Sequence, residues 1–389
     1  TLRLKPSYRN FNIMNSQDQM AIYQELQQKG YLNYAETANA ANSGIYGKMY
    51  QLITQYDPDK GQFGLPNTPE AKLAYLRDAE YRNTNWFDEL FSNAIMHNHS
   101  VSVSGGTDKS QYYGSLSAMF DPGWTLDSKV QRYTANLNFT HNISKKISVN
   151  LIGNASYRKQ KAPGTLSSDT DPVTGTVKRD FDINPYSYAL NTSRALDAHT
   201  FYTRSYAPFN IFSELDNNYI DLAVHDFRIS GSIDYKPTSK LKFTFLAAVK
   251  SAATSQEHNI LDNSNQALAY REMGTSTIRK ANPFLYKDPD HIYDLPITVL
   301  PYGGIYERTD NSSFGWDTRL SFSYNDVFAE KHIVNVYGGM ETNYTNRHST
   351  WFRGWGLQYT KGEIPLYAYQ VFKKGQEEKS DYFWMTNTH

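Results

Sequence analysis

Apolar and polar side chains alternate with a period of two through much of the chain. Between residues 131 and 140 the even positions are polar, and the odd positions carry Tyr133, Ala135, Leu137 and Phe139. The alternation returns between residues 147 and 159, after a short polar turn. This period over about ten residues is typical of a β-strand with one apolar face and one polar face.

The same pattern predicts a series of strands that are joined by connections of two kinds. The strands are expected at residues 99–104, 111–120, 131–140, 147–159, 226–235, 241–250, 312–324 and 332–344, with further strands at 2–8 and 382–385. Every second connection is a turn of about five or six residues, whereas the others have about ten, sixty-five and sixty residues. Long connections of this kind are uncommon in compact soluble domains.

Outer-membrane barrels sort their connections in this way, with tight turns at the periplasmic rim and long loops at the extracellular rim. The sequence therefore predicts an all-β fold, a transmembrane antiparallel β-barrel whose apolar strand face meets lipid. The long extracellular loops are expected at residues 14–97, 160–225, 251–311 and 346–380. Short helices are predicted within them, one capped by Asn15 or Ser16 and closed by Gly30, and one that begins at Pro69.

Composition supports a membrane strand protein and excludes several other classes. The 389 residues include 31 Tyr and 20 Phe, yet no apolar run is long enough for a membrane-spanning helix. Lys and Arg together number 39 and balance the 39 Asp and Glu, so no net charge favours a nucleic-acid partner. The absence of Cys excludes disulfides and thiol chemistry.

Aromatic residues near the predicted strand ends fit the interfacial girdles of a membrane barrel. These residues are Tyr133, Tyr157, Tyr235, Trp316 and Tyr324. The alternative is that they pack inside a soluble, carbohydrate-active β-protein. Dependence of the purified protein on detergent distinguishes the two.

Signatures of catalysis are missing from the sequence, so we expect a protein that is not an enzyme. His97 and His99 share a strand face but have no third metal ligand nearby. Asp57, Asp59 and Gly61 resemble half of a calcium loop, yet Thr68 stands where a bidentate Glu is required. We therefore predict no metal and no cofactor, and a calcium ion in this loop has no support.

Aromatic side chains in the long loops are the candidates for contact with a substrate or a partner. Aromatic platforms beside polar groups can stack on a sugar or a peptide and hydrogen-bond to it. The alternative is ordinary packing within the loops. The candidates are Tyr202, Tyr206, Phe209, Tyr302, Tyr306, Trp351 and Trp355.

Several motifs occur in the order found in the SusC/RagA family of TonB-dependent outer-membrane transporters. NTNWFDELF is followed by SGGTDKSQYYGSL and then by VQRYTANLNF, and these segments resemble the early barrel of that family. HIVNVYGGMETNY resembles a later hairpin, with Glu341 at the family's G-x-E position. The family usually has Gly-Tyr-Glu there, whereas this chain has Gly339, Met340 and Glu341.

The resemblance implies import of an oligosaccharide or a peptide across the outer membrane of a Gram-negative bacterium. It also implies outer-membrane lipid as surroundings, a SusD-like surface lipoprotein as partner, and coupling to TonB through a plug domain. No segment here resembles that plug, so we expect a fragment from the first part of a barrel of about 22 strands. The alternative function is a SusC-like barrel that serves as a structural or assembly scaffold.

Overall fold

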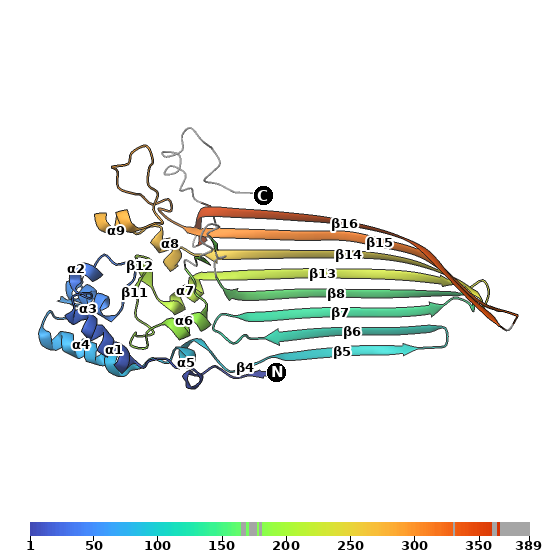
Figure 1. Ribbon diagram of the computed structural model, residues 1–389, viewed down its shortest axis with the longest axis horizontal. Coiled ribbons are helices and arrows are strands. Elements are labelled where there is room, and N and C mark those ends of the chain that lie inside the picture. The colour runs from blue at the N-terminus through green and yellow to red at the C-terminus, as the bar shows by residue number, and fades with distance from the viewer. Residues whose placement is uncertain (165–168, 171–176, 179–180, 330, 360–363, 366–389) are drawn as a thin grey trace.

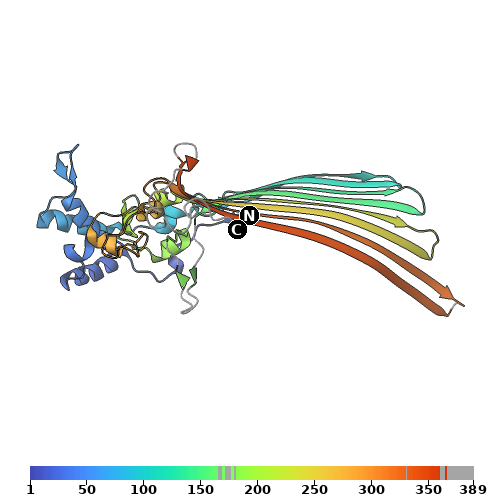
Figure 2. The same ribbon diagram turned by 90° about the horizontal axis from the view of Figure 1, so that it is seen from above.

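The computed structural model describes residues 1–164, 169–170, 177–178, 181–329, 331–359 and 364–365. It consists of a large antiparallel sheet with helices and loops gathered at one end (Figure 1). Figure 2 shows the sheet from above as a curved wall that extends away from these helices. We call residues 4–93, 181–217 and 261–303 the loop layer.

The large sheet has nine strands, and chain neighbours pair side by side in antiparallel order. The spatial order is β17, β16, β15, β14, β13, β8, β7, β6, β5. The bounds are β5 (His97–Gly106), β6 (Ser110–Asp121), β7 (Lys129–Asn142), β8 (Ile147–Pro163), β13 (Asn218–Tyr235), β14 (Leu241–Ile260), β15 (Gly304–Phe328), β16 (His332–Gln358) and β17 (Ile364–Pro365).

The strand register gives the sheet one apolar face and one polar face. One row of directly opposed residues runs through Val101, Leu116, Ala135, Ala155 and Phe227. The neighbouring row, one residue along each strand, runs through Ser100, Ser117, Thr134, Ser156 and Asp226. Successive side chains of a strand point to opposite faces, so the predicted two-faced strands are confirmed.

The apolar face is not covered by any described part of the chain. Val101 is 66% exposed and Met340 is 72% exposed, although both are fully apolar side chains. The two largest buried hydrophobic clusters lie instead mainly in the loop layer. A sheet of this kind is stable when lipid covers its apolar face and barrel closure satisfies its edges.

Four of the five predicted girdle residues lie towards the ends of the apolar face. Tyr133 and Tyr157 stack at the loop-layer end, with ring centroids 6.4 Å apart. Tyr235 and Tyr324 lie close to the short turns at the other end. Trp316 was expected near a strand end, but it lies opposite Val249 in the middle of β15, because β15 is much longer than predicted.

The strands extend further into the loops than the sequence pattern predicts. The loop predicted at 160–225 begins after Pro163 and ends before Asn218, and the loop predicted at 251–311 lies between Ile260 and Gly304. The loop predicted at 346–380 begins only after Gln358. These boundaries were wrong because alternation marks the apolar band of each strand, and backbone pairing continues beyond that band. The end of the first loop, predicted at residue 97, agrees with the start of β5.

The loop layer contains nine short helices and some small hairpins in its described residues. The helices are α1 (Ser16–Gln28), α2 (Tyr34–Thr37), α3 (Ile45–Thr54), α4 (Pro69–Arg82), α5 (Trp86–Leu90), α6 (Pro185–Asn191), α7 (Ile211–Asn217), α8 (Asn265–Ala269) and α9 (Ser276–Ala281), with a 3-10 turn at Tyr8–Asn10. The small strands of the loop layer are β2 (Tyr56–Asp57), β3 (Gln62–Phe63), β11 (Tyr202–Arg204) and β12 (Ala207–Phe209), and a further pair, β9 (Asp169–Thr170) and β10 (Val177–Lys178), lies outside it in sequence. None of the described helices is both long and apolar enough to cross a membrane.

The two predicted helices are present with the expected start signals. Asn15 caps α1 by accepting a hydrogen bond from the Asp18 amide at 2.8 Å, and Gly30 follows the helix with a φ of +87°. Pro69 is the first residue of α4.

The strand predicted at residues 2–8 is shorter than expected. Only β1 (Leu2–Arg3) is extended and paired, and its partner is β4 (Ala94–Ile95), just before β5. The strand predicted at 382–385 lies outside the described residues.

Candidate functional site

The loop layer is one folded unit, because segments far apart in sequence bind one another. Trp86 donates its indole N–H to the Ser193 carbonyl at 3.1 Å. The Gln19 side-chain oxygen accepts from the Ser193 hydroxyl at 2.7 Å and from the Arg194 amide at 2.9 Å. These contacts hold the first long segment against the second.

A small hairpin, β11–β12, lies at the centre of the candidate site. Ser205 and Tyr206 form its turn, and both have positive φ, 51° and 67°. Two consecutive residues with positive φ are typical of the tightest hairpin turns. The hairpin separates two cavities, of about 490 Å³ and about 410 Å³.

The larger cavity combines aromatic rings with a cationic group. The Arg204 guanidinium lies 4.7 Å from the centroid of the Phe209 ring and donates to the Asp182 carbonyl at 2.6 Å. Burial lowers the pKa of Arg204 and raises the pKa of Tyr188 to about 12. Asn191 lines the same cavity and provides a neutral amide. A cavity with this lining can bind an anionic or hydroxyl-rich group beside an apolar one.

The smaller cavity is bounded by the first and third long segments as well as by the hairpin. Burial lowers the pKa of the Lys48 ammonium in its wall. Tyr206 lines the cavity and donates its hydroxyl to the Ala281 carbonyl at 3.3 Å. The hairpin therefore contacts the third segment as well as the first.

Three of the seven predicted contact residues come together on this hairpin. Tyr202 is buried, lines both cavities, and accepts from the Asp197 amide through its hydroxyl at 2.9 Å. Phe209 is buried and lines the larger cavity, and Tyr206 lines the smaller one. Tyr202 and Phe209 also belong to the packed cores, so packing accounts for most of their surface.

The other four predicted residues form no common site. Tyr302 is in the third loop, whereas Tyr306, Trp351 and Trp355 lie in paired strands rather than in loops. Trp355 is opposite Ile305, which puts Tyr306 on the face opposite to Trp355. Trp355 packs edge-on against Tyr270, with ring centroids 5.3 Å apart.

A buried polar network joins the second long segment to the third, and no pattern in the sequence predicts it. The Glu214 carboxylate accepts from the Asn265 amide at 2.5 Å and from the Asn218 side chain at 3.1 Å. His258 Nε2 donates to the Asn218 side-chain oxygen at 2.7 Å. Gly164 approaches so closely that an added Cβ would clash with both Asn218 and His258.

Burial shifts the acid–base behaviour of this network, which lies at the end of β14 beyond the apolar band. It raises the pKa of Glu214, and it lowers the pKa of His258 to about 4 with help from the Arg353 guanidinium. His258 is therefore neutral at pH 7. A neutral imidazole that donates through Nε2 fits the carbonyl oxygen of Asn218.

Neither feature considered as a metal site has the required ligands. Asp57 accepts from the amides of Asp59 and Lys60 and pairs with the Lys60 ammonium at 3.0 Å, so it closes the β2–β3 hairpin. His97 and His99 contact one another at 3.0 Å. Across the part of the chain that the structure describes, no three potential metal-binding side chains cluster.

Sequence comparison finds relatives among TonB-dependent receptors. The chain is 25% identical over 159 residues to TonB-dependent receptor P3 of Formosa agariphila, a match that covers 34% of this chain and 16% of the relative. It is 31% identical over 81 residues to TonB-dependent receptor P26 of the same organism, covering 21% of this chain and 8% of the relative. No family model matches the chain.

Structural comparison finds the same fold in the RagAB peptide transporter. All of this chain superimposes on 37% of a chain of that structure with a TM-score of 0.60 and 14% identity. The TM-score is 0.53 for the RagAB peptide importer in its open-open state, with the same coverage. The chain therefore spans well under half the length of the proteins that it matches. The sheet has the fold of part of a RagA-type barrel, which confirms the barrel that the strand pattern predicts and the family type that the motif resemblance implies.

Proposed function

Since this chain shares its sequence motifs with TonB-dependent receptors of the SusC/RagA type and its fold with the RagAB transporter, we propose that it forms part of the wall of a TonB-dependent importer. The wall spans the outer membrane, and the loop layer lies on the cell surface. Transport rather than covalent chemistry is its function.

The contrast between the two faces of the sheet is the observation that carries this proposal. The row that contains Val101, Leu116 and Phe227 is apolar and is suited to contact with lipid. The row that contains Ser100, Ser117 and Asp226 is polar and is suited to contact with water. Closed into a barrel, such a wall encloses an aqueous lumen. The described parts of the long connections lie at one end, where they can bind cargo before it enters that lumen (Figure 1).

The cargo that we propose is a short peptide or an oligosaccharide, bound first beside the β11–β12 hairpin. The larger cavity offers Arg204 for a carboxylate or a hydroxyl group, and the rings of Tyr188 and Phe209 for an apolar group or a sugar face. Energy would come from TonB through a plug domain.

We propose that a SusD-like lipoprotein covers the loop layer. Tyr293 of the third loop is 95% exposed, and Tyr302 of the same loop is also exposed. Exposed aromatic side chains are enriched at protein interfaces. This loop is therefore the part of the layer best suited to a partner protein.

Uptake by intact cells tests the proposal. A strain that lacks the gene is compared with its parent for uptake of fluorescently labelled peptide pools and labelled oligosaccharide pools. We expect the deletion to abolish uptake of one pool, and the gene to restore it only in cells with functional TonB. Unchanged uptake of every pool would contradict the proposal and favour the scaffold alternative.

A cavity-filling variant locates the cargo site. Asn191→Trp places an indole in the wall of the larger cavity and should reduce uptake about tenfold or more. Asp59→Trp, at the tip of the β2–β3 hairpin away from both cavities, is the matched control and should not. Equal uptake by the two variants would exclude this cavity as the site.

A further inference from the structure

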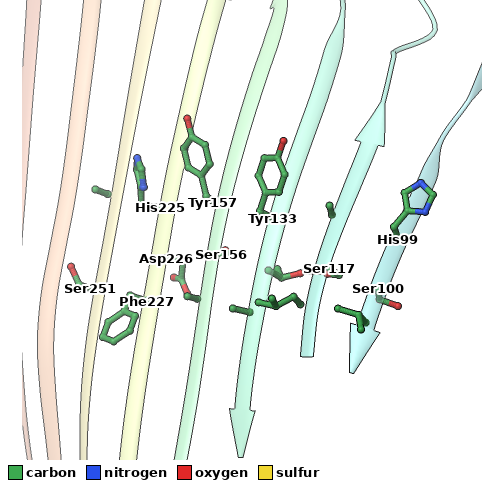
Figure 3. A pocket seen from close by; sticks show the side chains of 17 residues that line it. His99, Ser100, Ser117, Tyr133, Ser156, Tyr157, His225, Asp226, Phe227 and Ser251 are labelled. Carbon is green, nitrogen blue, oxygen red and sulfur yellow. Dashed lines mark hydrogen bonds between the residues drawn. The ribbon is translucent and has the colours of Figure 1, made fainter. Parts of the chain in front are cut away.

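A groove of about 790 Å³ lies on the apolar face near the loop-layer end of the sheet (Figure 3). Ala135 and Ala155 are its floor, between the larger side chains of Leu116 and Phe227 in the same row. Small residues flanked by large ones leave a hollow in an otherwise raised apolar surface.

The groove continues along the sheet in the direction of the short turns. A second hollow of about 450 Å³ shares Ala135 and Ala155 and extends to Gly114 and Gly153. Together they form an elongated apolar depression parallel to the strands. Its shape fits extended hydrocarbon chains.

Aromatic side chains border the groove on the side nearest the loop layer. The Tyr157 ring stacks on Tyr133 and lies 4.7 Å from the His225 ring, between centroids. Figure 3 shows the hydroxyl groups of both tyrosines pointing the same way along the strands, towards the loop layer. Tyrosine with its ring in apolar surroundings and its hydroxyl outward is typical of a membrane interface.

Three lysines lie just beyond this aromatic border, on the same face. Lys159 and Lys161 follow Tyr157 at alternate positions of β8, and Lys129 lies directly opposite Lys161 on β7. Like charges directly opposite one another destabilise a sheet. The Lys161 ammonium lies 4.2 Å above the Tyr219 ring, and Asp221 is the carboxylate opposite Lys161 on β13. Asp221 in turn lies opposite Glu257, but the Glu257 carboxylate binds the Arg308 guanidinium at 3.2 Å. Asp221 alone is therefore left to neutralise the three lysines, and the patch is positive.

We propose that the groove and the three lysines bind one phosphorylated, multiply acylated lipid of the outer leaflet. The acyl chains lie over Gly153 and Ala155, and the phosphate lies between Lys129, Lys159 and Lys161. Along β8 the outward side chains run from small, through aromatic, to cationic, which matches the order of hydrocarbon, interface and phosphate in such a lipid. The inference rests on the membrane placement given by the proposed function.

A second copy of the chain fits this surface less well. Two copies related by a two-fold axis along the membrane normal carry their lysines at the same depth. The two positive patches would then face each other across the interface. An anionic lipid neutralises this charge instead of doubling it.

Native mass spectrometry tests the proposal on the full-length protein, purified from outer membranes in detergent and stripped of lipid. Lipid A, a phosphorylated and multiply acylated glycolipid, is added in one arm, and zwitterionic phosphatidylethanolamine in the other. We expect one lipid A to remain bound in preference to phosphatidylethanolamine. The variant K129S/K159S/K161S should weaken retention about a hundredfold.

Matched variants distinguish lipid binding at the proposed site from non-specific attraction of the lipid to positive charge. K109S/K145S/K146S removes three lysines from the short β5–β6 and β7–β8 turns, at the opposite end of the strands, and should retain lipid as the wild type does. Ala155→Leu fills the floor and should weaken retention with all lysines present. The proposal is overturned if the wild type shows no preference, if K129S/K159S/K161S retains lipid normally, if both lysine variants lose it equally, or if dimers form in place of lipid adducts.

Uptake measured in cells that express the same variants distinguishes a failure of the lipid site from a failure of the proposed transport function. Transport without lipid retention would overturn the lipid site alone. Lipid retention without any transport would overturn the importer alone.

Discussion

The sheet and the loop layer are stabilised by contacts of different kinds. In the sheet, β15 and β16 pair residue by residue from Ile305 to Phe328, and their side chains remain largely open to the surroundings. In the loop layer, the free energy of folding comes from buried side chains such as Trp86 and Phe87, which contact segments about a hundred residues away. The sheet therefore depends on a repeated local pattern and a lipid environment, and the loop layer depends on individual residues.

The largest expected effect is the loss of stability in the loop layer, but not in the sheet, when one core side chain is removed. Trp86 is 1% exposed and anchors the second long segment through Ser193. Trp86→Ala should destabilise the loop layer by about 3–5 kcal/mol. Hydrogen exchange should increase across the loop layer and not in the sheet. Tyr81→Ala, at an exposed position of α4, is the control. Faster exchange throughout the sheet would show that the two regions unfold together.

The next largest effect is a loss of stability in the sheet, which depends on whether a substitution is on the apolar or the polar face. Ile229 lies midway along the apolar face of β13, and Ser230 lies next to it on the polar face. Ile229→Arg should cost about 2–4 kcal/mol because it places a cation in the lipid. Ser230→Arg should cost little, since its side chain reaches water. The measurement is the folded fraction in outer membranes, from heat-modifiable mobility on gels. Equal losses for the two variants would contradict the assignment of the faces.

A pH effect is expected at the loop-layer end of β14, where His258 joins the buried polar network, and not in the apolar band of the sheet. His258 has a folded pKa of about 4 against an ordinary value of 6.5, so the unfolded state binds its proton more readily. Its contribution to stability is complete above pH 6.5 and decreases as the pH falls towards 4. Between pH 7.5 and pH 5 the loss should be about 2 kcal/mol.

Hydrogen exchange in residues 261–303 at the two pH values measures this loss. Glu214 acts in the opposite sense, because its raised pKa favours the folded state as it becomes protonated. The comparison with His258→Gln isolates the histidine, since glutamine keeps an N–H donor for Asn218. An identical pH response in H258Q would exclude His258 as the source.

The smallest effect concerns an exposed ion pair on the polar face of the sheet. Arg319 binds Glu341 through two nitrogens at 3.0 and 2.7 Å, and both side chains are about half exposed. Exposed ion pairs contribute little to stability. Glu341→Gln should leave the folded fraction unchanged on the same gels. A clear loss would show that this face is less hydrated than the register implies.

The sequence predicted the sheet better than it predicted the site, for a physical reason. Tyr133, Ala135 and Leu137 are apolar and the residues between them are polar, because one strand face meets lipid and the other meets water. This alternation can be recognised from neighbouring residues alone. Beyond the apolar band the alternation is lost, because adjacent residues such as Ile305 and Tyr306 are both apolar or aromatic. The paired residues near Tyr306 and Trp355 were therefore missed.

The candidate site depends on contacts that no local pattern encodes. Tyr202, Tyr206 and Phe209 are close in sequence and were predicted as a cluster. The burial of Tyr202 and Phe209, however, depends on core clusters that include α3 and α5 of the first long segment. Glu214, Asn218 and His258 are ordinary polar residues in the sequence. Only the folded chain brings them together, at the junction of two loops and two strands.

The graded length of the strands has a mechanical consequence. The β5–β6 hairpin at one edge has strands of 10 and 12 residues, whereas β15 and β16 have 25 and 27. A force that peels hairpins from the sheet one at a time would release more than twice as much chain from the second hairpin as from the first. Each step would have its own length, so the extension at every rupture would identify which hairpin had left the membrane.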